Sequence, residues 1–241
     1  MDVAYFLKRR TTFLRGFYDD AVQPFQERQR RIDAEEPPYD DPSYSEDGEP
    51  AYLEDWMDAA ASIDLLGVTC VSILSDSLKV YFEDLRREIG FSFAEEKKAF
   101  KEGFVAAYRG VLGGIFQTDW TDCSVRFDVI EQVVLARNRA QHADDLGSFM
   151  LAHDPKTLRR HTKPFFADQA EIEDWLGHGG TPDSFLRPTM EVKREALFAA
   201  LDEVDSLADW IDAHMHAAWA WRAAWGPAFD PEGRSTVGFG G

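Results

Sequence analysis

The sequence has few cysteines, no long uninterrupted apolar run and little positive charge, and each shortage excludes a class of protein. Its 241 residues include only Cys70 and Cys123, too few for a disulfide framework or a zinc motif. No apolar run approaches the roughly 20 residues that a membrane-spanning helix needs. The first 17 residues lack the continuous apolar segment and the small-residue cleavage site of a secretory signal. We therefore expect a cytoplasmic protein without a membrane partner.

The acidity of the chain is concentrated in one segment. The net charge is −18, of which residues 1–32 contribute +3, residues 33–58 contribute −11 without a single base, and the remainder contributes −10. An acidic balance argues against a protein that coats nucleic acid with its whole surface. It does not exclude a small site with local positive charge. The 44% hydrophobic and 13% aromatic content excludes global disorder.

Apolar residues recur at three- and four-residue spacing, which is typical of amphipathic helices. This spacing, with capping patterns at Ser92–Glu95, Asp122 or Ser124, and Asp168–Glu171, predicts six helices: 3–32, 52–88, one from 92 to about 114, one ending near 146, 168–177 and 190–225. No segment shows a convincing strand pattern, so the expected fold is all-α. The expected parts are an N-terminal helical arm (1–32), an acidic Pro-rich linker or loop (33–50), a helical domain (51–225) and a flexible tail (226–241).

Two of these parts have alternative interpretations. In the first helix a set of apolar residues predicts a side that docks on the body of the protein: Phe6, Phe13, Phe17, Val22 and Phe25. The bases of this helix would instead suit an arm that touches RNA. Pro24 is expected to break or bend this helix. The acidic segment is expected to be solvated, with a nucleic-acid mimic that masks a basic site as the alternative.

The most specific stretch is EQVVLARNRAQHADDL, residues 131–146, in which a polar cluster follows an apolar helical run. Polar groups at the edge of a buried surface need partners or a function. Asn138 and His142 are four residues apart and share a helix face, whereas Arg137 lies about 140° around the helix from His142. Convergence of the arginine and the histidine is therefore easiest where two copies of the helix meet, which predicts a homodimer.

Arginine and histidine together suit metal-free phosphodiester transfer in RNA. Histidine exchanges protons near neutral pH, and arginine offers a fixed charge and a two-pronged donor to phosphate. In this scheme His142 acts on the 2′-hydroxyl or on the leaving oxygen, Arg137 stabilises charge at phosphorus, and Asn138 orients the histidine or binds phosphate.

At these residues the chain resembles a known family. Arg137-Asn138, three residues and His142 match the RNxxxH form of the motif of HEPN (higher eukaryotes and prokaryotes nucleotide-binding) domains. The resemblance implies a small, usually dimeric helical bundle across about residues 52–146. It also implies a metal-independent ribonuclease without a cofactor, of the kind found in toxin–antitoxin and phage-defence systems. An antitoxin or regulatory protein would then be a partner. His142 would be the acid/base, Arg137 the transition-state stabiliser and Asn138 the supporting group.

A basic cluster follows the motif, and no acid lies between Asp154 and Asp168. The candidate RNA-backbone contacts are the bases of this cluster and the motif's second arginine: Arg139, Lys156, Arg159, Arg160 and Lys163. A solvated loop is the alternative.

The catalytic interpretation of the motif has two alternatives. Arg137 would pair with Asp144 or Glu131 and His142 would be an ordinary helix-end histidine, or the domain would be a HEPN-like module that binds without cleaving. His214 and His216 are two residues apart and point to different sides of a helix, so we expect surface histidines and no metal site.

Overall fold

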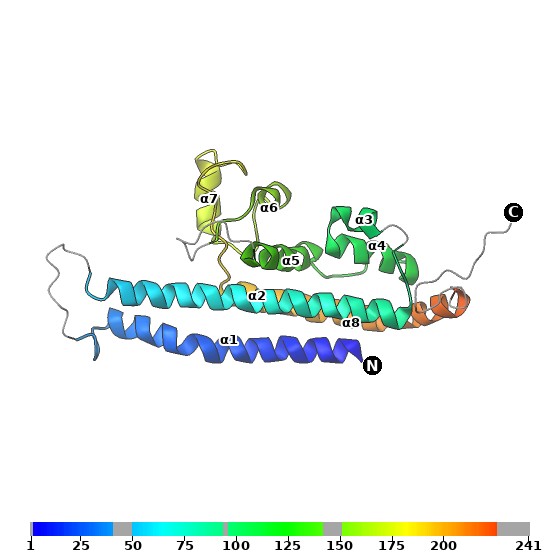
Figure 1. Ribbon diagram of the computed structural model, residues 1–241, viewed down its shortest axis with the longest axis horizontal. Coiled ribbons are helices and arrows are strands. Elements are labelled where there is room, and N and C mark those ends of the chain that lie inside the picture. Colours follow the sequence, from blue (N-terminus) through cyan, green and yellow to red (C-terminus); the bar gives the residue numbers. More distant parts are fainter. Residues whose placement is uncertain (1, 41–49, 94–95, 142–150, 226–241) are drawn as a thin grey trace. The chain divides into compact units, whose positions relative to one another are not determined.

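The computed structural model describes residues 2–40, 50–93, 96–141 and 151–225, and over these ranges every element is a helix (Figure 1). Ala152 and Thr189 form an isolated antiparallel bridge. The predicted all-α class is confirmed for this part of the chain. The helices are α1 (Val3–Asp33), α2 (Leu53–Ile89), α3 (Glu96–Ala99), η1 (Phe100–Glu102), α4 (Phe104–Phe116), α5 (Phe127–Gln141), α6 (Pro155–Arg160), α7 (Gln169–Gly177) and α8 (Arg194–Trp225).

The chain divides into two compact units, each described below by itself. Unit 1 comprises Met1–Thr12, Leu74–Val134 and Ala199–Gly241, and unit 2 comprises Phe13–Ile73 and Leu135–Phe198. Unit 1 therefore holds the start of α1, the second half of α2, α3, η1, α4, most of α8 and the first turns of α5. Unit 2 holds α6, α7 and the remaining turns of the shared helices. The tail 226–241 and residues 41–49 of the acidic segment lie outside the described residues.

Unit 1 has an apolar core with an aromatic cluster. Its buried side chains come from α1, α2, α4, α5 and α8, among them Leu7, Leu78, Leu85, Leu112, Ile130, Leu201 and Ala208. The Trp120 ring lies 4.4 Å from that of Trp210, which in turn stacks on His214 at 3.8 Å. Trp120 also donates from Nε1 to the Arg109 carbonyl at 3.0 Å, so its polar atom is satisfied although the residue is only 7% exposed.

Unit 2 contains a close backbone approach at Gly67. A Cβ atom added to this glycine would lie 2.4 Å from the Val192 carbonyl oxygen, a distance that no side chain tolerates. The partner of this glycine is the segment that precedes α8, which contains Val192.

The predicted docking side of α1 is wrong for three of its five residues, since Phe6, Phe13 and Phe17 are 49%, 67% and 38% exposed. Val22 is buried as predicted, and Phe25 is partly exposed. The buried positions follow the helical period: Ala4, Leu7, Thr11, Leu14, Tyr18 and Val22. Position around the helix decides burial, not the size of the ring. α1 also runs through Pro24 without a break, although proline removes one backbone donor there.

The helix predicted from 92 to about 114 is divided. Gly103 has a φ of 108°, in a region that favours glycine, and it separates η1 from α4. α4 then extends to Phe116 and is closed by Gln117 in the left-handed conformation, two residues beyond the predicted end. Of the capping pattern at its start, Glu95 lies outside the described residues. The short helix α6 was not predicted.

One described helix meets the length and composition of a membrane span. α2 contains an 18-residue window of mean hydropathy 1.6, of which 28% is buried. The sequence predicted no membrane-spanning segment because the prediction considered only uninterrupted runs of apolar residues. The window in α2 contains polar residues but is apolar on average. A single helix of this kind is weak evidence, since core helices of soluble proteins pass the same test.

Candidate functional site

The predicted motif lies where α5 changes from apolar to polar. Val129, Ile130 and Val133 are fully buried, and the exposure begins near Arg137, which is half-buried. Asn138 is exposed, and α5 ends at Gln141. His142, the predicted acid/base, lies outside the described residues, as does Asp144. The structure thus places two of the three predicted catalytic residues together at a helix end.

Arg137 and Asn138 are in contact. The Arg137 Nη1 donates to Asn138 Oδ1 over 3.4 Å, which is a long hydrogen bond. Neighbouring residues point about 100° apart on a helix, so this contact needs the arginine to bend sideways along the surface. The guanidinium and the amide therefore form one polar group at the end of α5.

Arg139 has a structural contact. Its Nε donates to the carbonyl oxygen of Ala152 at 2.7 Å, in a partly buried position. A charged donor on a backbone carbonyl makes a strong hydrogen bond. This arginine, predicted to bind RNA, is thereby fixed against the segment that precedes α6.

His153 is a buried histidine that the sequence reasoning did not single out. It is 5% exposed, and its Nε2 donates to the Phe166 carbonyl at 3.0 Å. Arg187 in turn donates from Nε to the His153 carbonyl at 2.9 Å. Burial lowers the pKa of the His153 imidazole, and the bond to Phe166 partly opposes this. Nothing in its sequence context, between Ala152 and Asp154, distinguishes it from a surface histidine.

The basic cluster is partly neutralised by acids that lie outside its own sequence segment. Arg159 forms an ion pair with Asp183, and Lys163 forms a longer one with Glu173 at 3.7 Å. Arg160 and Lys156 are exposed at α6, and Lys156 has no ion pair with a described residue. The structure thus brings the five predicted RNA-binding residues into the same unit, but it gives Arg139, Arg159 and Lys163 protein partners.

The two histidines of α8 differ from the surface pair that was expected. His214 donates from Nδ1 to the Trp210 carbonyl at 2.7 Å and stacks on that residue's ring, with its side chain 27% exposed. His216 is exposed. Within the described ranges, no three His, Cys, Asp or Glu side chains are grouped so that they could hold a metal ion. Both cysteines are free thiols. Cys70 is buried in α2, and Cys123 lies between α4 and α5.

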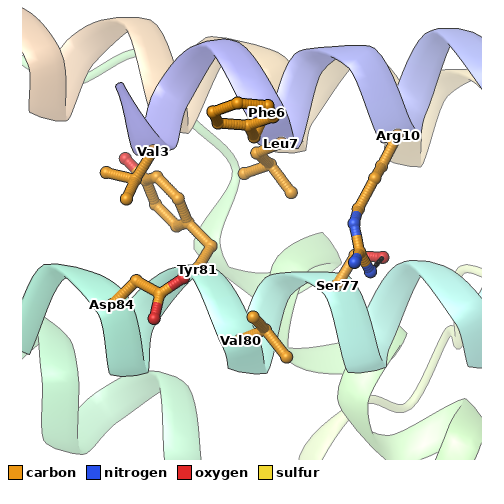
Figure 2. Close-up of a pocket in the computed structure, with 8 residues that line it drawn as sticks. All are labelled: Val3, Phe6, Leu7, Arg10, Ser77, Val80, Tyr81 and Asp84. Atoms are coloured by element: carbon orange, nitrogen blue, oxygen red, sulfur yellow. Dashed lines mark hydrogen bonds between the residues drawn. The ribbon is translucent and has the colours of Figure 1, made fainter. Parts of the chain in front are cut away.

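Two cavities in unit 1 were also not anticipated. One, of about 240 Å³, lies between the start of α1 and the second half of α2, with Phe6, Arg10, Ser77 and Tyr81 among its walls (Figure 2). The other, of about 250 Å³, lies where α1, α2 and α8 meet, and it shares Tyr81 with the first. The helical pattern of α2 and α8 predicts their buried stripes but not where these stripes leave a gap.

Comparisons of the chain with protein-family models, with curated proteins and with solved structures found no match. The family resemblance of the motif therefore stays a prediction from the sequence.

Proposed function

We propose that this protein is a metal-independent endoribonuclease of the HEPN type that acts as a homodimer. The observation that carries the proposal is the Arg137-Asn138-x3-His142 motif, which begins in the last turn of a helix whose preceding turns are buried. The proposal includes the HEPN-like bundle and the role of a toxin or defence component held in check by an antitoxin.

The chemistry proposed for the motif is transesterification. The 2′-oxygen attacks the neighbouring phosphorus and the 5′-oxygen leaves, giving a 2′,3′-cyclic phosphate and a free 5′-hydroxyl. His142 removes the proton from the 2′-hydroxyl or gives one to the leaving oxygen. Arg137 stabilises the added negative charge at phosphorus, and Asn138 orients the histidine or binds a phosphate oxygen.

Three observations support this proposal. Arg137 is half-buried, so its charge is less screened than that of a fully exposed arginine. Asn138 is exposed beside it, where a phosphate could reach both groups. Lys156 is an exposed cation in the same unit and suits a contact with the RNA backbone.

The deciding experiment is cleavage of labelled RNA by the purified full-length chain in EDTA. The wild type is expected to cleave. His142→Ala is expected to lose about 10²–10⁴-fold in rate, the usual contribution of acid–base catalysis. Arg137→Ala is expected to lose about 10²–10³-fold, the usual contribution of a group that stabilises transition-state charge. A matched control is His216→Ala, which removes an exposed histidine and should leave the rate unchanged. A substrate with 2′-O-methyl groups should resist cleavage because its 2′-oxygen cannot lose a proton.

Cleavage that persists in both motif variants would overturn the proposal, and so would an inert wild type on every RNA tested. The dimer has a separate test. A strictly monomeric mass at micromolar concentration would exclude a site composed of two protomers. An inert but dimeric protein that binds RNA would instead support the alternative of a HEPN-like module that does not cleave.

A further inference from the structure

The cavity at the meeting point of α1, α2 and α8 is surrounded by carboxylates. Asp2 precedes α1, Glu88 is in the last turn of α2, and Asp212 is in α8. The side chains of Glu88 and Asp212 form no hydrogen bond or ion pair with any described residue. Asp2 uses Oδ1 to accept the backbone N–H of Tyr5 at 2.8 Å. Three helices thus bring acids from distant parts of the chain to one opening.

The same cavity has apolar walls and one exposed aromatic ring. Met215 and Trp219 line it from α8, together with aliphatic side chains of the core. Trp219 is 43% exposed, so one part of its ring remains accessible. Aromatic faces attract cations, and aliphatic walls favour a carbon chain.

The most specific feature of this cavity is the hydroxyl of Tyr81. This residue is 3% exposed, and its hydroxyl has no hydrogen-bond partner among the described residues. A buried hydroxyl without a partner costs stability, so an orphan of this kind needs an explanation. The Tyr81 ring extends from α2 toward Val3, which lines both cavities (Figure 2). Burial and the charges of Asp212, Asp209, Glu88 and Asp2 raise the pKa of this phenol, so the hydroxyl stays protonated near these acids.

Among the described residues, the basic groups nearby form no ion pair with Glu88 or Asp212, although the pKa of Lys8 is raised by its hydrogen bond to Asp209 and also by the charge of Asp212. Lys8 is engaged by Asp209 at 2.7 Å. Arg222 donates to the backbone carbonyl of Glu88 at 2.7 Å, not to its carboxylate. The acids are also too dispersed for a metal ion, because no three of them are grouped as metal ligands in the described part of the chain. An extended organic cation could meet them one at a time.

We infer that this cavity binds an aliphatic ammonium cation, with its carbon chain against Met215 and Trp219 and its ammonium groups on Glu88, Asp212 and Asp2. The Tyr81 hydroxyl accepts from the cation or donates to a carboxylate that the cation repositions. The volume of about 250 Å³ suits a linear amine of a few carbons. The site is independent of the proposed ribonuclease motif, because every residue that lines it belongs to unit 1.

Calorimetric titration of the full-length chain with 1,4-diaminobutane, butylamine and butan-1-ol, at one ionic strength set with NaCl, tests the inference. The diamine should bind most tightly, butylamine more weakly and the neutral alcohol not measurably. Asp212→Asn and Glu88→Gln should each weaken the diamine about tenfold, as expected for a charge-assisted hydrogen bond. Asp174→Asn, which removes an exposed carboxylate from α7, is the matched control and should change nothing.

Tyr81→Phe distinguishes a ligand site from a packing defect. It removes the orphan hydroxyl, so the Tm of the free protein should rise while the affinity for the diamine falls about threefold or more. The inference is overturned if the alcohol binds as well as the amines, if neither amine binds at millimolar concentration, or if Asp174→Asn weakens binding as much as Asp212→Asn. A blocked lysine peptide identifies the source: binding of the peptide as well as the diamine indicates a lysine of a protein partner, and binding of the diamine alone indicates a free amine.

Discussion

The contacts described within unit 1 differ in kind from those described within the loops of unit 2. In unit 1 the Trp120 and Trp210 rings pack within an aliphatic core, and the Glu88 carboxylate forms no hydrogen bond or ion pair with a described residue. In the loops of unit 2, backbone carbonyls and acids are matched to cationic side chains, as in the bonds from Arg139 to Ala152 and from Arg187 to His153.

The contrast separates charges that hold the fold from charges that are available for a ligand. Arg139 and Arg159 are basic residues that sequence reasoning assigned to RNA, yet both have protein partners. Glu88 and Asp212 were not assigned a role from the sequence, yet their carboxylates form no hydrogen bond or ion pair with a described residue. Substitutions in unit 1 should therefore affect stability through packing, and substitutions in the unit 2 loops through hydrogen bonds and pH.

The largest effect is expected for Trp120→Ala in unit 1. Removing this 7% exposed ring empties space next to Trp210, and the free energy of unfolding should fall by about 3–5 kcal/mol. The loss should be the same at low and high salt, because the contacts are apolar. Chemical denaturation at two NaCl concentrations measures both. Phe185→Ala, at a ring that is 97% exposed, is the control and should change stability by less than about 0.5 kcal/mol.

Gly67→Ala should be the most damaging small change in unit 2. The added Cβ would collide with the Val192 carbonyl oxygen, and separating the two backbones should cost about 2–3 kcal/mol. Gly16→Ala is the matched control, since nothing lies within 4 Å of the added atom in the middle of α1. There the same substitution should stabilise by about 0.5–1 kcal/mol. Equal effects at both glycines would contradict the close approach.

Arg139→Ala and Lys156→Ala compare a cation that is bound to the protein backbone with a cation that is exposed and could contact RNA. Losing the bond to the Ala152 carbonyl should cost about 1–2 kcal/mol of stability. Lys156→Ala should change stability by less than about 0.5 kcal/mol, because the side chain is exposed without an ion pair in the described structure. If the proposed RNA contact is real, Lys156→Ala should instead reduce the slope of log affinity against log salt by about 1. Chemical denaturation measures the change in stability, and filter binding of RNA at several salt concentrations measures the change in slope. A large loss of stability for Lys156→Ala with none for Arg139→Ala would refute the distinction.

The helices could be predicted because their periods and caps are local properties. Asp168 accepts the backbone N–H groups of Ala170 and Glu171, as its capping pattern predicted, and α7 follows to Gly177. The buried stripe of α8, with Leu197, Leu201 and Val204, also follows from spacing alone. The spacing of apolar residues predicts which side of a helix is buried, but it does not predict which residue of another element packs against that side.

The site was less predictable for that reason. The Arg137-Asn138 pair is adjacent in sequence and was foreseeable. The partner of Arg159, Asp183, is 24 residues away, and that of Arg139 is 13 residues away, so only the folded chain reveals them. The orphan hydroxyl of Tyr81 likewise depends on what α1 and α8 bring near it.

The smallest effect concerns pH and His153. Burial lowers the pKa of its imidazole below that of the unfolded chain, so between the two values the unfolded chain binds a proton that the folded one does not. The stability contributed by neutral His153 is therefore complete above the unfolded value, near pH 6.5, and is lost as the pH falls toward the folded value. Asp154 and Glu171 favour the protonated form and limit the loss, whereas Arg139 opposes protonation.

Denaturation of the wild type and of His153→Gln between pH 7.5 and pH 5, bracketing the ordinary histidine value, isolates this contribution. Glutamine can still donate to the Phe166 carbonyl but does not titrate. The variant should lose less stability than the wild type over this range, and the difference should appear only below about pH 6.5. Parallel curves would show that another histidine governs the acid side, and the solvent-exposed His178→Gln is the control that should leave the wild-type curve unchanged.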